Sequence, residues 1–202
     1  MSDVILTADR CGWAGDDPLM VAYHDDEWGM PVWDDTELFD RLMLECFQAG
    51  LSWRTILHRR QHFHRAFHGW DAERIAAYGP DDIARLLADP GIIRNRLKVE
   101  GAVKNAKAFL NVREERGSFA NFIWSFTGGG VLDRPAPTGL GDIPATTPES
   151  DAMSKALKKL GFTFVGSTII YAFMQSAGMV NDHVVGCAAR ERCIAAAANL
   201  PI

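Results

Sequence analysis

The sequence predicts an all-α protein, and three observations support this class. Apolar residues recur at helical spacing, most clearly between Glu37 and Cys46. The ends of such segments carry helix signals, namely a capping Asp, Ser or Thr at the start and Gly at the end. No segment shows a convincing strand pattern or an internal repeat. With 202 residues, 48% hydrophobic and 23% charged, the chain can form one large domain or two small ones.

The first half of the chain contains most of the predicted helices. Neither helical nor strand periodicity persists from Arg10 to Gly29, so we expect a loop with short helical pieces there. The next segment begins on Asp34 or Asp35 as the helix cap and ends at Gly50. The helices predicted in this half cover about 35–49, 52–67, 71–78 and 81–88, one that follows the turn of residues 89–98 and ends near 116, and 118–125.

The second half begins with a segment, 127–148, that holds many of the Gly and Pro residues. We expect a long loop there, and such loops in compact domains are often functional. Two helices are predicted at about 148–160 and 168–177, joined by the Gly-bounded turn 161–166, which makes a helix-hairpin-helix candidate. Such a turn can present backbone N–H groups to a phosphate, although an ordinary helical hairpin is the commoner alternative. The tail, 188–202, carries little information.

The charge and cysteine content limit the function classes. A net charge of −5 argues against general nucleic-acid binding by a basic surface, although residues 94–107 allow a local basic face. The N-terminus lacks the basic and apolar regions of a signal peptide, and no apolar run reaches the roughly 18 residues of a membrane span. We therefore expect a cytoplasmic protein with no membrane partner, whose four cysteines are thiols or metal ligands rather than disulfides.

A structural zinc site is the first chemical hypothesis. His183 and Cys187 are four residues apart, so on a helical turn both side chains would face the same way. Cys11 and His24 form a second pair near the other terminus. Four such ligands would close a tetrahedral Zn²⁺ site and clamp a weakly structured N-terminal segment to the C-terminal one. The alternative is a set of unpaired core thiols and histidines.

The second hypothesis concerns Trp13, Tyr23, Glu45 and Trp53. A carboxylate inside an apolar helix, as at Glu45, is costly unless it is paired or hydrogen-bonded, or its pKa rises. Trp53 offers a flat face for stacking close to this carboxylate. These residues suggest a pocket that binds a flat, electron-poor ring. The alternatives are a Trp-rich core and an ion pair between Glu45 and the basic segment 94–98.

The segments that carry these groups resemble the 3-methyladenine DNA glycosylase I (Tag) family. The resembling segments are RCGWAGDDPLMVAYHDDEWGMP, LFDRLMLECFQAGLSW, DPGIIRNRLKVEGAVKNAKAF and SDAMSKALKKLGFTFVGSTIIYAFMQSAGMVNDHVVGC. The resemblance implies an all-α helix-hairpin-helix glycosylase that hydrolyses the N-glycosidic bond of 3-methyladenine in alkylated double-stranded DNA and so starts base-excision repair. Residues 1–188 would be one glycosylase domain of two helical lobes that share a base pocket, and 189–202 a C-terminal tail.

The resemblance also implies residue roles. The family's zinc ligands match Cys11, His24, His183 and Cys187. Its base pocket matches Trp13, Tyr23, Glu45 and Trp53. As the catalytic pair, Glu45 would accept a hydrogen bond from the exocyclic amine of the base, and Tyr23 would add a polar contact. Trp53, and Trp13 with it, would stack on the cationic ring.

The expected DNA contacts are Leu51, as a wedge in the base stack, and Gly161, Phe164 and Gly166 of the hairpin turn. A plain core leucine is the alternative for Leu51. No Lys occurs in the pocket motifs, so water would attack the sugar, and we expect a monofunctional monomer without lyase activity.

Two other functions compete with this one. A non-catalytic module could recognise damaged or flipped bases with the same aromatic residues and zinc clamp. A zinc-dependent hydrolase is a weaker alternative, because four protein ligands leave no open metal position. The chain departs from the family at Met20, where relatives often carry an aromatic residue, across 127–144, and beyond Cys187.

Overall fold

The computed structural model of the protein describes residues 9–201 and confirms the all-α prediction. Residues 1–8, where the sequence shows no signal peptide, lie outside the described part. Within 9–201 the regular elements are helices, and the only pairing of β type is an isolated bridge between Leu132 and Val180. The α-helices are α1 (Pro18–Asp26), α2 (Asp35–Gln48), α3 (Trp53–Leu57), α4 (Arg60–Ala66), α5 (Ala72–Ala76), α6 (Pro80–Ala88), α7 (Arg96–Arg116), α8 (Phe119–Trp124), α9 (Pro148–Lys159), α10 (Ser167–Ser176) and α11 (Ala188–Ala197). In this range, none of the helices combines the length and the apolar character that a membrane crossing requires.

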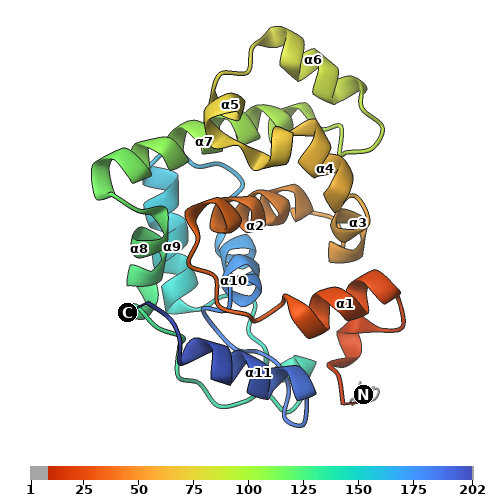
Figure 1. Cartoon of the computed structure of the whole chain (residues 1–202), viewed down its shortest axis with the longest axis vertical. Helices are drawn as coiled ribbons and strands as arrows, with labels where there is room; N and C mark the ends of the chain where they lie inside the picture. The colour runs from red at the N-terminus through yellow and green to blue at the C-terminus, as the bar shows by residue number, and fades with distance from the viewer. Residues whose placement is uncertain (1–8, 202) are drawn as a thin grey trace.

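Helix α2 occupies the middle of the molecule, with α4 to α7 on one side of it and α1, α10 and α11 on the other (Figure 1). Its start follows from local chemistry, because the Asp34 side chain accepts hydrogen bonds from the backbone N–H groups of Thr36 and Glu37. Leu38, Phe39 and Leu42 are fully buried, and α10 packs against this helix. The centre of the core therefore includes the helix that carries Glu45.

Several predicted elements differ from the observed ones. The helix expected over 52–67 is two helices, because the Arg59 N–H bonds to the Ile56 carbonyl three residues back and closes α3 early. His183 and Cys187 do not lie on a helical turn, since residues 185–186 form a non-helical turn with Gly186 at φ 85°. The tail for which no element was predicted forms α11, which packs against α1.

The C-terminal end of α2 is held by a buried ammonium group. The Nζ atom of Lys98 donates to the carbonyls of Phe47 at 2.7 Å and Ala49 at 2.6 Å. These carbonyls belong to the last turn of a helix, where no intrahelical partner is available. The alternative in which Glu45 pairs with segment 94–98 is therefore wrong, because Lys98 in this segment bonds to main-chain oxygens instead. This contact fixes the Gly50–Leu51 turn against the start of α7.

Replacing Lys98 with Met is expected to lower the free energy of unfolding by about 1–3 kcal/mol, since one buried and one part-buried carbonyl lose their donor. Urea unfolding measures this change. Lys104→Met on the same helix is the matched control, because Lys104 is exposed and its loss should alter stability by less than about 0.5 kcal/mol. Equal unfolding midpoints for the two variants would contradict the assignment.

The predicted hairpin between α9 and α10 is present and is locked onto α7. Asn105 accepts a hydrogen bond from Thr163 N at 2.7 Å and donates to Thr163 O at 3.1 Å. Gly101 of α7 permits this close approach, because a Cβ there would lie 2.9 Å from Thr163 Oγ1 and 3.1 Å from the Phe164 ring. Gly161, at φ 93°, provides the left-handed backbone that starts the turn. The hairpin turn is thus a rigid part of the surface.

Candidate functional site

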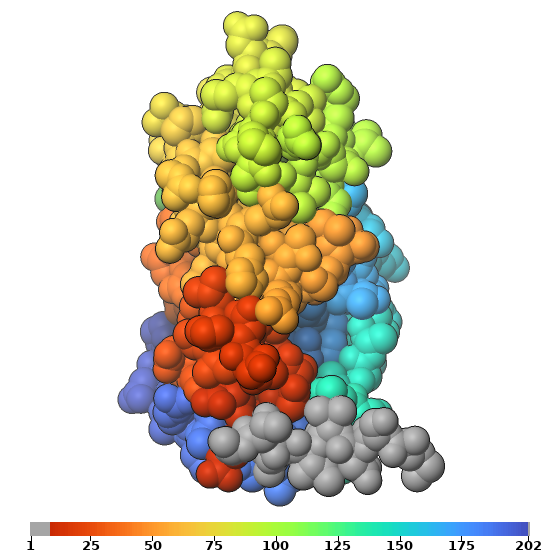
Figure 2. All heavy atoms as spheres, turned by 90° about the vertical axis from the view of Figure 1, so that its right-hand side faces the viewer, coloured from red at the N-terminus to blue at the C-terminus, as the bar shows by residue number. Residues whose placement is uncertain are grey.

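A cavity of about 230 Å³ lies where α1, α2, α3, α10 and the 127–148 loop meet. It is smaller than the roughly 300–1,000 Å³ of sites for drug-sized ligands, so its size suits one small ring system. Figure 2 shows the corresponding face, on which red α1, the orange segment after α2 and the teal loop border a hollow with blue residues behind it. The four pocket residues expected from the sequence, Trp13, Tyr23, Glu45 and Trp53, all line this cavity.

The cavity wall is largely aromatic. The rings of Tyr23 and Trp53 are 4.9 Å apart between centroids, and Trp13 lies edge-on to Tyr23 at 6.4 Å and to Trp28 at 5.0 Å. The indole N–H of Trp53 is buried and has no hydrogen-bond partner among the described residues. Such a wall presents π faces to a ligand, and it favours flat and positively charged rings.

Among residues 9–201, Glu45 provides the one carboxyl group that lines the cavity. It projects from α2, is 3% exposed, and its Oε2 atom has no hydrogen-bond partner within the described chain. Burial raises the pKa of Glu45 to about 8, although the nearby Arg41 guanidinium partly offsets this shift. Arg41 itself donates to the carboxylate of Glu37 and to the carbonyls of Glu27 and Ser176. The site therefore holds a carboxyl group that is not satisfied by the protein.

The same burial affects the hydroxyl group of Tyr23. Its pKa is raised well above the ordinary value, first by burial and then by the charge of Glu45. Tyr23 therefore stays protonated over the working pH range and can donate a hydrogen bond from the cavity wall.

Further lining residues were missed by the sequence interpretation. Trp28 and Gln175 lie in motifs that were quoted, but nothing in their spacing indicated that they line the cavity. Leu140 and Ile143 come from the loop 127–148, for which only the length indicated a function. These two apolar side chains form part of the cavity wall.

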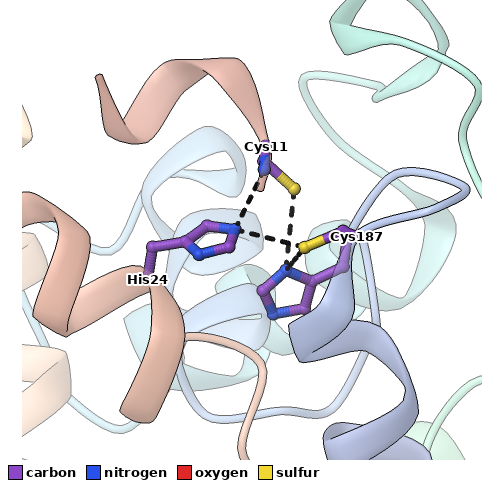
Figure 3. Close-up of side chains that lie close together, drawn as sticks. Cys11, His24 and Cys187 are labelled. Atoms are coloured by element: carbon purple, nitrogen blue, oxygen red, sulfur yellow. Dashed lines mark hydrogen bonds between the residues drawn. The ribbon is translucent and has the colours of Figure 1, made fainter. Parts of the chain in front are cut away.

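The Cys and His residues expected as metal ligands come together in a second, buried cluster. Cys11, His24, His183 and Cys187 each offer one ligand atom, and these atoms lie within 4.8 Å of one another. The Nδ1 atom of His183 is 3.6 Å from Cys11 Sγ and 3.4 Å from Cys187 Sγ, and His24 Nε2 is 3.5 Å from Cys187 Sγ. Figure 3 shows Cys11, His24 and Cys187 pointing toward one another. This cluster can hold a metal ion.

The protonation of the cluster is set by its surroundings. Burial lowers the pKa of His24 and brings that of His183 to about 4, so both rings are neutral and can act as ligands. Asp25 accepts a hydrogen bond from His24 Nδ1 at 2.7 Å, and Arg10 holds the pKa of Asp25 down at about 2. His183 donates from Nε2 to the Trp28 carbonyl at 2.9 Å. Each imidazole therefore points its other nitrogen into the cluster, the arrangement found when a metal-bound histidine donates its second ring N–H to a carboxylate or a carbonyl.

Trp28 joins the two sites. Its ring lies 4.6 Å from that of His183 between centroids, and it also lines the aromatic cavity. Trp13 likewise lies 5.2 Å from the His24 ring. The Cys/His cluster therefore packs against two of the aromatic rings that line the cavity.

The residues expected to contact DNA lie on the surface or near it. Leu51 is 40% exposed in the turn after α2, so the alternative of a plain core leucine is wrong. Gly161 is exposed, whereas Gly166 is half-buried and immediately precedes α10. Phe164 is half-buried, with its ring packed over Gly101. At Phe164 the backbone of this turn is therefore available to a ligand, while part of the ring packs on α7.

Over residues 9–201, an all-helical fold with a hairpin turn and an open aromatic slot that ends on a carboxyl group has the features of an enzyme that binds a single extruded base. The comparisons with known proteins agree with this class. Residues 13–191 match the family described as methyladenine glycosylase. The chain belongs to this family, as the resemblance predicted.

Named relatives cover almost the whole chain. The DNA-3-methyladenine glycosylase 1 of Escherichia coli (strain K12) is 49% identical over 179 residues, which are 89% of this chain and 95% of the relative. The DNA-3-methyladenine glycosylase of Haemophilus influenzae is 45% identical over 178 residues, 88% of this chain and 96% of the relative.

Solved structures give the same result. A crystal structure of 3-methyladenine DNA glycosylase I superimposes with a TM-score of 0.86 at 49% identity, covering 89% of this chain and 98% of that chain. The Staphylococcus aureus enzyme, whose structure addresses 3-methyladenine recognition, has a TM-score of 0.86 at 33% identity and covers 90% and 96%.

Proposed function

We propose that this protein is a DNA repair glycosylase that hydrolyses the N-glycosidic bond of 3-methyladenine in alkylated double-stranded DNA and so starts base-excision repair. The observation that carries the proposal is Glu45, a buried carboxyl group with no hydrogen-bond partner for Oε2 among residues 9–201, in an aromatic cavity of base size. The relatives' names support it, as does a related structure, 32% identical with a TM-score of 0.86, of a variant in complex with 3-methyladenine.

The chemistry requires little of the protein. Methylation at N3 gives the adenine ring a positive charge, so the ring is already a good leaving group. Flipping the nucleotide costs a few kcal/mol, and less for a damaged base. The aromatic wall, with Trp53 and Trp13, stabilises the cationic ring by about 0.5–2 kcal/mol for each favourable contact.

Glu45 and Tyr23 act on the edge of the base. Glu45 accepts a hydrogen bond from the exocyclic amine, and the cationic ring favours loss of the Glu45 proton, so that an ion pair forms in the cavity. Tyr23 adds a polar contact from its hydroxyl. Water then adds to the sugar C1′, the C1′–N9 bond breaks, its electron pair neutralises the departing ring, and one proton is released.

Among the described residues that line the cavity there is no lysine. No amine of the protein would therefore attack the sugar to form an imine. The enzyme is monofunctional and lacks lyase activity.

The test of the function is base release. Duplex DNA treated with a methylating agent is incubated with the protein, and the released bases are separated by chromatography. Release of 3-methyladenine supports the proposal. Binding to the methylated duplex without any release would instead support the alternative, a module that recognises damaged bases.

The DNA contacts follow from the surface placement of the turns. We propose that Leu51 enters the stack in place of the flipped base and that the hairpin turn of Gly161, Phe164 and Gly166 binds a phosphate. The backbone N–H groups of Phe164 and Gly166 would make the contacts, since that of Gly161 already donates to the Lys158 carbonyl at 3.1 Å. Phosphate contacts of this kind make affinity fall with salt.

Leu51→Ala is expected to slow release from duplex DNA about tenfold, or about 1.4 kcal/mol. The side chain loses three carbons, each of which contributes about 0.8 kcal/mol when fully buried, and the wedge would bury them only in part. Ile194→Ala is the matched control, since Ile194 is similarly exposed, at 48%, but lies on α11. Single-turnover release from one methylated duplex compares the two. Equal rates in both variants would remove Leu51 from the mechanism.

The metal proposed for the Cys/His cluster is structural Zn²⁺. Tetrahedral zinc with bonds of about 2.3 Å to sulfur and 2.0–2.1 Å to nitrogen separates S and N ligands by about 3.5 Å. Three of the four S–N distances in the cluster, at 3.4–3.6 Å, fit this value. Four protein ligands leave no open position, so the zinc would join the N- and C-terminal segments and would not take part in hydrolysis.

The organisation proposed for the chain is one glycosylase domain over residues 1–188, of two helical lobes that share the base pocket, with 189–202 as a C-terminal tail. The position of the cavity, which is lined by residues of both α2 and α10, supports the two-lobe organisation. The protein would act as a monomer in the cytoplasm. Light scattering of the purified protein tests the monomeric state.

A further inference from the structure

A chain of hydrogen bonds ends on the cavity at Gln175. Arg134 donates to the hydroxyl of Tyr171 at 2.7 Å, and Tyr171 donates to Oδ2 of Asp182. Gln175 donates from Nε2 to the same Oδ2 atom at 2.9 Å. Asp182 is 4% exposed and Tyr171 is 2% exposed, whereas Gln175 lines the cavity together with Glu45. The network therefore connects a buried carboxylate to the binding site through one carboxamide.

The network determines which way the carboxamide faces. A carboxylate is an acceptor only, so the Gln175 atom that meets Asp182 must be the nitrogen. Burial and the neighbouring Asp182 raise the pKa of Tyr171, which keeps this hydroxyl protonated and its hydrogen directed at the carboxylate. Among the described residues no hydrogen bond uses Oε1, so this acceptor is available to a ligand in the cavity that Gln175 lines. The free edge of the amide thus presents the acceptor Oε1 beside the second N–H of Nε2.

We propose that Gln175 is a specificity-determining residue whose Oε1 accepts a second hydrogen bond from the exocyclic amine of the bound base. An amine has two N–H groups, so Glu45 and Gln175 can each take one. A purine with a carbonyl at this position would place its oxygen against the Glu45 carboxylate and Oε1 of Gln175, which is repulsive, and could gain only the second N–H of Nε2. The site would therefore favour 3-methyladenine over 3-methylguanine. Asp182 is the positioning residue that fixes the amide.

This inference rests on the proposed function, and one experiment separates the two. Duplex DNA treated with dimethyl sulfate contains both methylated purines, so the release rates of 3-methyladenine and 3-methylguanine are measured in the same reaction. Gln175→Met keeps the length of the side chain without its polar atoms. We expect this variant to release 3-methyladenine about tenfold more slowly while release of 3-methylguanine does not fall.

Gln61→Met, an exposed glutamine on α4, is the matched control and should keep the wild-type ratio. Asp182→Asn retains an acceptor oxygen and should keep the ratio, whereas Asp182→Ala should lower it. Metal content and melting temperature are recorded for each variant because Asp182 precedes His183. A purely structural role for Gln175 would slow release of both bases equally.

Binding of the free bases provides a second readout that does not require catalysis. Tryptophan fluorescence titrations with 3-methyladenine and 3-methylguanine should show about tenfold weaker binding of the first to Gln175→Met and no weaker binding of the second. Wild-type protein that releases neither base contradicts the proposed function. Wild-type protein that releases 3-methyladenine, with an unchanged release ratio and unchanged binding in Gln175→Met, overturns only the role of Gln175.

Discussion

Glu45→Gln is expected to lower the single-turnover release of 3-methyladenine by about 100-fold, the size of effect that follows loss of one preorganised electrostatic group. The amide can still accept a hydrogen bond from the base, but it carries no charge. It therefore cannot form the ion pair with the cationic ring that the aromatic cavity shields from water. Single-turnover release from methylated duplex DNA measures this change, and a rate equal to that of the wild type would remove Glu45 from the mechanism.

The same substitution is expected to make the protein relatively more stable as the pH rises. Burial raises the pKa of Glu45 from 4.5 to about 8, so the folded state holds a proton that the unfolded state has lost. Wild-type stability therefore falls between pH 4.5 and pH 8, by about 1.4 kcal/mol for each unit, and levels off above pH 8. Glu45→Gln lacks this loss. Thermal melts from pH 4.5 to 8.5 should show that the melting temperature of the variant rises relative to that of the wild type over this range. Parallel curves of melting temperature against pH would contradict the raised pKa.

Cys187→Ser is expected to abolish metal binding and to lower the melting temperature by at least about 10 °C. Structural zinc contributes several kcal/mol to folding, and each kcal/mol shifts the melting temperature of a protein of this size by about 2–4 °C. Metal analysis by mass spectrometry and calorimetry measure the two effects. A chelator should lower the melting temperature of the wild type and leave that of the variant unchanged.

Cys193→Ser is the control for this prediction. Cys193 is as buried as Cys187, at 3% exposure for each, but it lies outside the four-residue cluster. The control should therefore keep one metal ion per chain and its response to the chelator. Wild-type protein purified without metal, or equal melting temperatures for the two serine variants, would contradict the zinc site.

The helices whose signals are local were predictable from the sequence. Helix α2 has its cap at Asp34 and its apolar face within its own residues, and the structure begins and ends it within two residues of the prediction. The division between α3 and α4 was not predictable, because it accompanies distant contacts such as those of Arg59 with the carbonyls of Pro90 and Gly91. Helix α11 was missed because it is rich in alanine and has little apolar periodicity of its own.

The candidate site likewise contains residues that the sequence could identify and residues that it could not. The cost of burying a carboxylate identified Glu45 from its position in an apolar helix, before any contact was known. Gln175 gave no such signal, because a glutamine in a helix is unremarkable until its neighbours across space are known. The same holds for Leu140 and Ile143, whose loop has no periodicity and reaches the cavity only in the folded chain.

An enzyme that acts on methylated DNA must itself survive the reagents that methylate DNA. Thiolates are the protein groups most open to such attack, and all four cysteines are at most 3% exposed. Burial raises the pKa of Cys193 to about 11 and also raises that of Cys46, so neither exists as a reactive anion near neutrality. The burial of its cysteine sulfur atoms would thus keep the protein active while the reagents that methylate DNA are still present.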